Sequence, residues 1–321
     1  MAPTGENNLQ AMGTHLVKPR KSTLISNLRR YKYFYILMIP ALTLYLIFNY
    51  APMAGISLAF FDYQFNKKIW EMPFVGFKHF DNLFGNPEFW KVLKNTLVIS
   101  FGRLIIEFPM PIVVAVLLNE IRKSSLKRFF QTVYTFPHFL SWVLVVGILN
   151  GMLLNDGVIN QALATMGQEK ISFFTESNYF LGMIFFTNIW KEVGWGAIIY
   201  LATLAGIDPE LYSAAAVDGA NRWHRLRYIT WPGIKSTAVI MLILNCGGIL
   251  NAGFDQILNM YNPAVYNVAD IIDTYIYRQA FHQGVNFSYN TAVGLFKSVI
   301  SFTLVLSVNK IAKLLGEEGL F

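Results

Sequence analysis

The sequence predicts an all-α membrane protein with six transmembrane helices and both termini in the cytoplasm. Three observations support this fold class. Of the 321 residues, 54% are hydrophobic and 14% are charged, whereas soluble domains carry about 25% charged residues. Six apolar stretches reach the ~20 residues that a helix needs to cross a bilayer. Lys and Arg are unevenly distributed among the segments between those stretches, which is typical of a chain that crosses a membrane repeatedly.

The six predicted spans together define a transmembrane domain over residues 33–315. It follows a cytoplasmic segment 1–32, expected to be partly disordered, and precedes a cytoplasmic tail 316–321. The first span is too long for a cleaved signal peptide, so we expect it to be retained. The spans are Tyr33–Ala59, Asn95–Asn119, Phe129–Leu154, Tyr179–Leu204, Ser236–Tyr261 and Ala292–Leu315.

The orientation follows from the charges between the spans. Sixteen Lys and Arg residues lie in the N-terminal segment, the second and fourth connections and the C-terminal end, and seven lie in the other three connections. Basic connections stay in the cytoplasm, so this asymmetry places both termini inside. It also explains the net charge of +7 without a nucleic-acid partner. We expect the spans to be surrounded by membrane lipid.

Two connections on the predicted outer side are long. Residues 61–94 are rich in Phe and Trp, with Pro73 and Pro87 interrupting any long helix. They predict short helices at the membrane surface or a docking surface, with an ordinary aromatic belt as the alternative. Residues 262–290 are long enough to reach down toward the interior of the bundle.

The predicted cytoplasmic connection 205–235 has the signals of two short helices. Asp208 is a good N-cap, Pro209 suits the first helical position, and Gly219 is placed to end the helix. Asn221 is expected to cap a second helix, which Pro232 and Gly233 would stop. The first helix carries three consecutive alanines, whose small side chains let another protein surface approach closely.

This connection resembles the EAA loop of ABC importer permeases. Ser213-Ala-Ala, then Gly219, then Ile229-Thr-Trp231-Pro232 match the family's Glu-Ala-Ala, Gly, Ile-x-Leu and Pro at the same intervals. The departures are Ser213 in place of Glu and Trp231 in place of Leu. Without that Glu, no specific salt bridge is expected at Ser213.

Further stretches are similar to the oligosaccharide-importing branch of this family, including the complex-polysaccharide group to which alginate importers belong. The resemblance extends from about Tyr33 to the C-terminus. The stretches are Phe74-Val75-Gly76, Pro87-Glu88-Phe89-Trp90, Asn95-Thr96 and Gly294-Leu295-Phe296-Lys297-Ser298.

The resemblance implies a type I ABC importer permease in the bacterial inner membrane, forming half of a translocation path. It implies a second permease, homologous or identical, a dimer of ATP-binding subunits that hold ATP and Mg²⁺, and an extracytoplasmic solute-binding protein. The sequence agrees, since it contains no G-x-x-x-x-G-K-[ST] phosphate loop. By this analogy the ATPase-coupling residues are Ser213, Ala214, Ala215, Ala216, Asp218, Gly219, Ala220, Ile229 and Pro232.

Charged residues inside the spans are costly and usually face a bundle interior or a water-filled path. Arg103 and Glu107 lie four residues apart on one helical face and predict an intramembrane ion pair. Lys297 has no acidic neighbour in its own span. We therefore expect it to pair across helices with Asp255 or Glu192, or to meet an anionic substrate.

A sugar path needs aromatic faces for the apolar sides of pyranose rings and amides or carboxylates for hydroxyl groups. The tryptophans have packing or interfacial anchoring as alternative roles. Arg103 and Lys297 would suit the carboxylates of a uronic acid polymer. The candidate path residues are Asn188, Trp190, Trp195, Asn245, Asn251, Asp255 and Lys297. Gly247, Gly248 and Gly253 in the fifth predicted span permit close contacts and a bend.

The sequence gives little support for an enzymatic function. The five histidines are scattered without HExxH or other ligand spacing, and Cys246 stands alone without an evident base. We expect no catalytic residue, metal site or cofactor on this chain. The alternatives are a permease of the same fold for another polar solute and an ion-coupled secondary transporter, which needs no ATPase.

Overall fold

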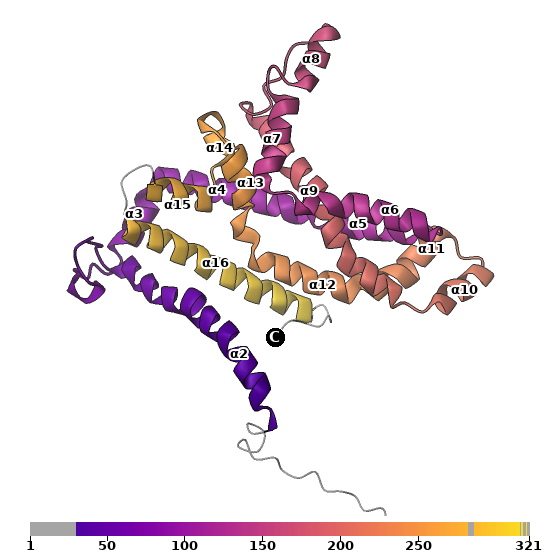
Figure 1. Cartoon of the computed structure of the whole chain (residues 1–321), viewed down its shortest axis with the longest axis horizontal. Coiled ribbons are helices and arrows are strands. Elements are labelled where there is room, and N and C mark those ends of the chain that lie inside the picture. The colour runs from indigo at the N-terminus through magenta and orange to yellow at the C-terminus, as the bar shows by residue number, and fades with distance from the viewer. Residues whose placement is uncertain (1–29, 282–285, 315, 317–318, 320–321) are drawn as a thin grey trace, which may run out of the picture. The chain divides into compact units, whose positions relative to one another are not determined.

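The computed structural model describes residues 30–281, 286–314, 316 and 319, and the described residues form helices and turns with one isolated β-bridge, Phe61 to Phe74. This confirms the all-α class (Figure 1). The chain divides into two units, residues 1–55 and 56–321, which are described separately. The predicted disorder of segment 1–32 and the predicted tail 316–321 fall almost entirely outside the described residues.

Five described helices are long and apolar enough to cross a membrane: Lys32–Phe60, Pro87–Asn119, Trp142–Thr165, Arg222–Gly247 and Phe287–Leu314. The fourth predicted span corresponds to α9, Ser177–Ala205. At 1.5 Å per residue its 29 residues are long enough to span. The polar residues near its middle lower its hydropathy, and it is not among the five. The count of six spans therefore stays a prediction.

The N-terminal unit contains α2 (Lys32–Tyr45), a π turn at Leu46–Tyr50 and the start of the 3₁₀ segment Ala51–Phe60. These pieces follow one another as one 29-residue helix. Its bounds agree closely with the predicted first span, Tyr33–Ala59. Pro40 lies inside α2 without ending it.

The second unit begins with a short 3₁₀ turn, Ile69–Glu71, and α3, Lys78–Gly85. A single long helix follows as α4 (Pro87–Gly102), a π turn (Arg103–Glu107) and α5 (Pro109–Asn119). It starts eight residues before the predicted second span because Asn86 caps it, its side chain accepting from the Glu88 N–H at 2.9 Å. The π turn precedes Pro109, which has no N–H to donate.

The third predicted span, Phe129–Leu154, is not one helix, and that prediction is wrong. The chain forms α6 (Ser124–Thr135), a 3₁₀ turn η5 (Phe136–Phe139), α7 (Trp142–Leu153) and α8 (Val158–Thr165). Pro137 disrupts the α-helical hydrogen bonds, and Leu140 adopts an extended conformation. Ser141 then starts α7 afresh, accepting from the Leu144 N–H at 3.3 Å.

Helix α9 packs against α5 and α6. Two glycines allow these helices to approach closely. A Cβ at Gly194 would collide with the carbonyl of Tyr134, and a Cβ at Gly196 would lie 2.9 Å from the ring of Pro111. A cluster including Ala115, Ala197 and Tyr200 fills the space between α5 and α9 and extends to the next span.

The connection after α9 forms α10 (Pro209–Val217) and α11 (Arg222–Arg225). Asp208 and Asn221 cap them as predicted, and Gly219 takes a φ of +76° at the turn. However, Pro232 does not stop the second helix. A π turn at Leu226–Thr230 precedes it, and the chain continues as α12, Trp231–Gly247.

The fifth predicted span, Ser236–Tyr261, is also wrong as a continuous helix. Helix α12 ends at Gly247, a 3₁₀ turn η7 covers Ile249–Asn251, and α13 runs from Phe254 to Met260. Between them Ala252 and Gly253 take φ angles of +45° and +79°. The glycines identified in the sequence therefore allow a break rather than a gentle bend.

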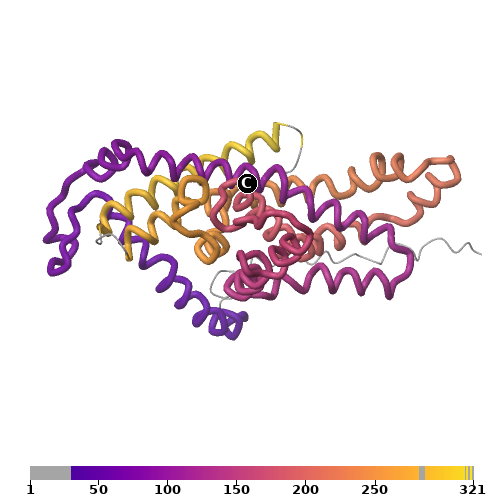
Figure 2. Tube along the Cα trace, turned by 90° about the horizontal axis from the view of Figure 1, so that it is seen from above, coloured from indigo at the N-terminus to yellow at the C-terminus, as the bar shows by residue number. Residues whose placement is uncertain are grey.

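The remaining chain forms a 3₁₀ turn at Pro263–Val265, α14 (Tyr266–Ala269), α15 (Ile272–Phe281) and α16 (Phe287–Leu314). Helix α16 runs beside α12, and its first half packs with α3, α4 and α15 around Phe89 and Tyr275. Figures 1 and 2 place α3 at one end of the second unit and α10 at the other.

Candidate functional site

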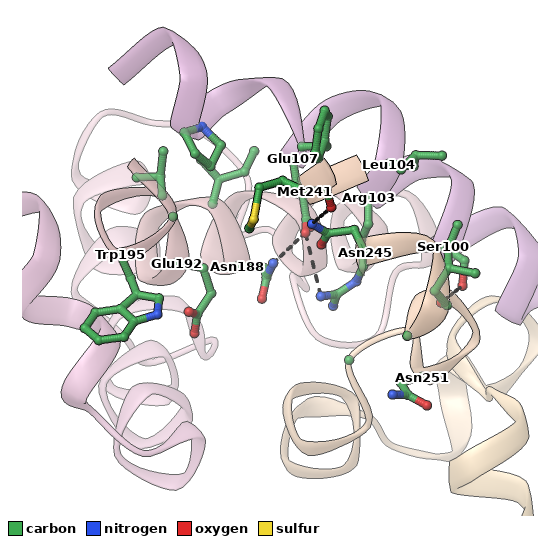
Figure 3. Close-up of a pocket in the computed structure, with 18 of the residues that line it drawn as sticks. Ser100, Arg103, Leu104, Glu107, Asn188, Glu192, Trp195, Met241, Asn245 and Asn251 are labelled. Atoms are coloured by element: carbon green, nitrogen blue, oxygen red, sulfur yellow. Dashed lines mark hydrogen bonds and ion pairs between the residues drawn. The ribbon is translucent and has the colours of Figure 1, made fainter. Parts of the chain in front are cut away.

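A cavity of about 440 Å³ lies in the second unit, where α4, α5, α9 and α12 surround the break before α13. The lining residues recur at helical spacing, with Ser100, Arg103 and Glu107 on one helix and Asn188, Glu192 and Trp195 on another. Figure 3 shows Trp195 and Glu192 toward one end and Ser100 and Asn251 toward the other.

Arg103 is the centre of a hydrogen-bonded network beside this cavity. Its Nη1 lies 3.7 Å from Glu107 Oε2, and its Nη2 donates to Gln256 Oε1. The buried Gln256 in turn donates to the carbonyl of Ile184 at 2.7 Å and to Thr187 Oγ1 at 2.8 Å. The network therefore ties the second span, α9 and α13 together.

Asn188 and Gly253 complete the surroundings of Arg103. The Asn188 amide donates to Glu107 Oε2 at 2.5 Å (Figure 3). A Cβ at Gly253 would collide with the guanidinium of Arg103. Together with its positive φ, this leaves glycine as the residue that fits between α12 and α13.

Charges at the cavity are paired within the protein. Glu192 Oε1 accepts from Lys191 Nζ at 2.9 Å, and Glu192 Oε2 lies 2.6 Å from Nδ1 of His138. Arg103 faces Glu107. An anionic ligand entering this cavity would therefore compete with a carboxylate of the protein for its cation.

A second cavity, of about 460 Å³, lies between α12, α15 and α16 and shares Asn251 with the first. Lys297 Nζ lies 2.7 Å from both carboxylate oxygens of Asp273 and 2.8 Å from Asn251 Oδ1. The partner of Lys297 is thus Asp273, and the sequence-based choice of Asp255 or Glu192 was wrong. Asp273 was missed because it lies in a predicted external connection, which folds back as α15.

Ion pairs hold α15 in place. Arg278 Nη1 donates to Glu88 Oε1 at 3.0 Å, and its Nη2 donates to Asp270. Tyr275 is fully buried, and this burial, with a hydrogen bond to Tyr289, raises the pKa of the Tyr275 hydroxyl. The helix that presents Asp273 to Lys297 is therefore fixed to the start of α4.

The predicted path residues separate into two groups. Asn188, Trp195, Asn245 and Asn251 line the first cavity, and Lys297 lines the second. Trp190 and Asp255 line neither. Trp190 is two residues from Asn188, which turns it to the opposite side of α9. Three residues that line the first cavity, Ser100, Glu192 and Met241, were not predicted from the sequence. Glu192 could have been, because it lies four residues after Asn188 and therefore on the same face of the helix.

The connection predicted to couple the permease to its ATPase is open to solvent. Every described residue of α10 is at least partly exposed, with Leu211 and Val217 exposing apolar side chains. Tyr212 binds Thr230 through their hydroxyls at 3.0 Å, which holds α10 to the following helix. Ser213 donates to the carbonyl of Pro209 at 3.2 Å, within its own helix.

Comparison with known proteins decides the family. Residues 107–317 match the family described as the binding-protein-dependent transport system inner membrane component. The chain belongs to this family. It is therefore an inner-membrane permease subunit of an ABC importer rather than an enzyme, as the EAA-like loop suggested.

Relatives and a solved structure cover nearly the whole chain. It is 46% identical to Protein LplB of Bacillus subtilis, over 92% of both chains. It is 43% identical to the polygalacturonan/rhamnogalacturonan transport system permease protein YteP of the same organism, over 95% of both. It also matches the crystal structure of a bacterial alginate ABC transporter in complex with alginate pentasaccharide-bound periplasmic protein. The TM-score is 0.84 at 36% identity, covering 92% of this chain and 99% of that one. The type I permease fold is thereby confirmed.

Proposed function

We propose that this permease subunit forms half of the translocation path for an oligosaccharide delivered by an extracytoplasmic binding protein. It pairs with a second permease, homologous or identical, and with a dimer of ATP-binding subunits that hold ATP and Mg²⁺. The observation that carries the proposal is the polar cavity beside the break between α12 and α13. Broken helices at membrane depth commonly line solute sites, because their irregular backbone needs a polar cavity.

The lining of the first cavity suits a sugar. The indole of Trp195 is about half exposed, at 49%, and offers a flat apolar face. Asn188, Asn245 and Asn251 supply amide donors and acceptors for hydroxyl groups. These four residues and Lys297 line the proposed path, whereas Trp190 and Asp255 lie outside both cavities.

We propose that the oligosaccharide is acidic, with uronic acid residues. The names of YteP and of the alginate transporter support this class. The two cations at the cavities, Arg103 and Lys297, already hold carboxylates of Glu107 and Asp273. A substrate carboxylate would therefore exchange with one of these partners, so that neither cation is left without a counterion at membrane depth.

The coupling role is proposed for the exposed α10 and the turn after it. The figures support it, since α10 and α3 lie at opposite ends of the second unit, as opposite sides of a membrane require. Six spans with both termini in the cytoplasm fit this arrangement. The residues proposed to receive the ATPase surface are Ser213, Ala214, Ala215, Ala216, Asp218, Gly219, Ala220, Ile229 and Pro232.

A crosslinking experiment tests the coupling. Ala215→Cys in a Cys246→Ala background, expressed in the native membrane with its partners, is treated with a thiol-to-amine crosslinker and analysed by mass spectrometry. We expect a P-loop ATPase joined to Ala215→Cys, whereas Leu306→Cys on α16 serves as a control that captures none. Recovery of the chain without an ATPase would contradict the coupling role of α10.

A transport assay tests the substrate class. The purified complex is reconstituted in proteoliposomes with the binding protein, and ATP hydrolysis is measured with oligogalacturonate and with a neutral maltooligosaccharide. We expect stimulation by the acidic sugar alone. Equal stimulation by the neutral sugar would contradict the acidic class, and stimulation by neither would point to another polar solute.

A further inference from the structure

His138 stands in direct contact with the cavity wall, although it lies on a different element. It belongs to η5, the 3₁₀ turn that interrupts the third predicted span. Its imidazole is stacked on the indole of Trp195, with ring centroids 4.4 Å apart and an angle of 4° between the ring planes. Its Nδ1 lies 2.6 Å from Glu192 Oε2. Two neighbouring side chains of α9 at the cavity are thus held by one histidine.

The backbone of His138 is fixed to the same helix. Lys191, which is buried, donates from Nζ to the His138 carbonyl at 2.8 Å and to Glu192 Oε1 at 2.9 Å. Its ammonium also lies 5.5 Å from the ring centroid of Trp142, at the start of α7. The break in the third predicted span is therefore attached to α9 by a continuous set of contacts at Lys191, Glu192 and Trp195.

Contacts with His138 and Phe139 restrict the orientation of the Trp195 indole. Phe139 meets the indole edge-on, with centroids 6.0 Å apart, and His138 covers one of its faces. The indole nevertheless remains 49% exposed and lines the first cavity. The face opposite His138 is therefore the one open to a ligand, and its plane is set by the parallel imidazole.

We propose that His138 is a positioning residue for carbohydrate binding. It holds the indole of Trp195 with one face turned to the cavity, so that a pyranose ring stacks on that face. Glu192 keeps the imidazole in its plane through Nδ1. This inference rests on the proposed function, since it concerns the same cavity, and it adds a residue outside the lining.

Two substitutions separate the contacts of His138. His138→Phe retains a ring that stacks on Trp195 but loses the bond to Glu192. His138→Gln retains a polar partner for Glu192 but loses the ring. Aromatic pairs contribute about 0.5–1.5 kcal/mol beyond the area that they bury. We therefore expect His138→Gln to weaken oligosaccharide binding about three- to tenfold, and His138→Phe to weaken it less.

The test measures the Kd of a fluorescent oligogalacturonate for the assembled transporter in nanodiscs, without binding protein, for the wild type, both His138 variants, Trp195→Ala and the double variant. Basal ATP hydrolysis and the elution volume report assembly. We expect Trp195→Ala to weaken binding strongly and His138→Gln to add little to it, because one acts through the other. The effect should lie in Kd or KM rather than in kcat.

The outcomes separate the two proposals. If Trp195→Ala leaves the Kd unchanged, the proposed sugar contact itself fails. If Trp195→Ala weakens binding but His138→Gln does not, only the positioning role fails. Additive losses in the double variant would also overturn it, because His138 would then act independently of Trp195. Should His138→Gln fail to assemble, His138→Leu, which also removes the stacking ring, carries the same comparison.

Discussion

Two predicted spans are broken in this structure, and they are broken in different ways. In the fifth, the backbone itself sets the geometry, through positive φ angles at Ala252 and Gly253 and the guanidinium of Arg103 against Gly253. In the third, η5 is held by side chains, chiefly those of Lys191 and His138. A break set by positive φ angles tolerates few residue types at those positions. A break held by side-chain contacts can lose those contacts one at a time.

The largest effect is expected from Gly253→Ala. A Cβ there meets Arg103 while the residue keeps a left-handed conformation, and strain and overpacking each cost about 1–3 kcal/mol. The melting temperature of the detergent-solubilised complex should fall sharply and transport should be lost. Gly182→Ala on α9 is the matched control, since nothing lies within 4 Å of its Cβ. Equal melting temperatures for the two would show that the fifth break is not set by the backbone.

Lys191→Met tests the third break. Methionine keeps most of the buried stem but removes both donated hydrogen bonds, which leaves the His138 carbonyl and Glu192 without this partner. Unpaired buried polar groups cost about 1–3 kcal/mol. We expect a smaller fall in melting temperature than for Gly253→Ala, with assembly retained. Lys191→Arg, which restores a cation, should recover part of the loss, and no recovery would make the stem rather than the charge responsible.

The sequence predicted the class of fold, the family and the caps of α10 and α11 because each depends on local patterns: apolar length, charge bias and residues such as Asp208 and Asn221. It could not predict the two breaks. Pro137 and the glycines up to Gly253 permit a bend or a stop without deciding between them, and contacts with α9 and Arg103 fix the stop in the folded protein.

The candidate site was partly predictable for the same reason. Asn188, Trp195, Asn245 and Asn251 were found because polar and aromatic residues inside apolar spans are unusual. The partner of Lys297 was not found, since Asp273 reaches it through the folding of a connection rather than through helical spacing. Trp190, like Trp195, is an aromatic residue inside an apolar span, but it lies on another face of α9 and does not line the cavity.

Arg103 and Lys297 differ in how closely each contacts its carboxylate partner, and Arg103 lies beside the break in the fifth predicted span. Lys297 contacts both oxygens of Asp273, whereas Arg103 lies 3.7 Å from its closest Glu107 oxygen beside the fifth break. Exchange with a substrate carboxylate should be easier at Arg103. Arg103→Gln should therefore reduce uptake of oligogalacturonate relative to a neutral oligosaccharide by about tenfold, the size of one charge-assisted hydrogen bond.

Lys297→Gln is the comparison for that prediction, measured in the same proteoliposomes with the same pair of sugars. It should change the ratio of acidic to neutral uptake less than Arg103→Gln does. A larger change at Lys297 would place carboxylate recognition in the second cavity. A ratio equal to that of the wild type in both variants would remove cation recognition from the path altogether.

The smallest effect is expected at the start of α7. Ser141 caps this helix with a bond of 3.3 Å from the Leu144 N–H, and loss of such a cap costs about 1 kcal/mol. Ser141→Ala should lower the melting temperature slightly and leave the oligogalacturonate Kd unchanged, because Lys191 and His138 still hold η5 to α9. Ser141→Thr retains the hydroxyl and should match the wild type. A change in Kd for Ser141→Ala would mean that the cap, rather than the contacts with α9, sets the break, and the third span would then resemble the fifth in being fixed by its own backbone.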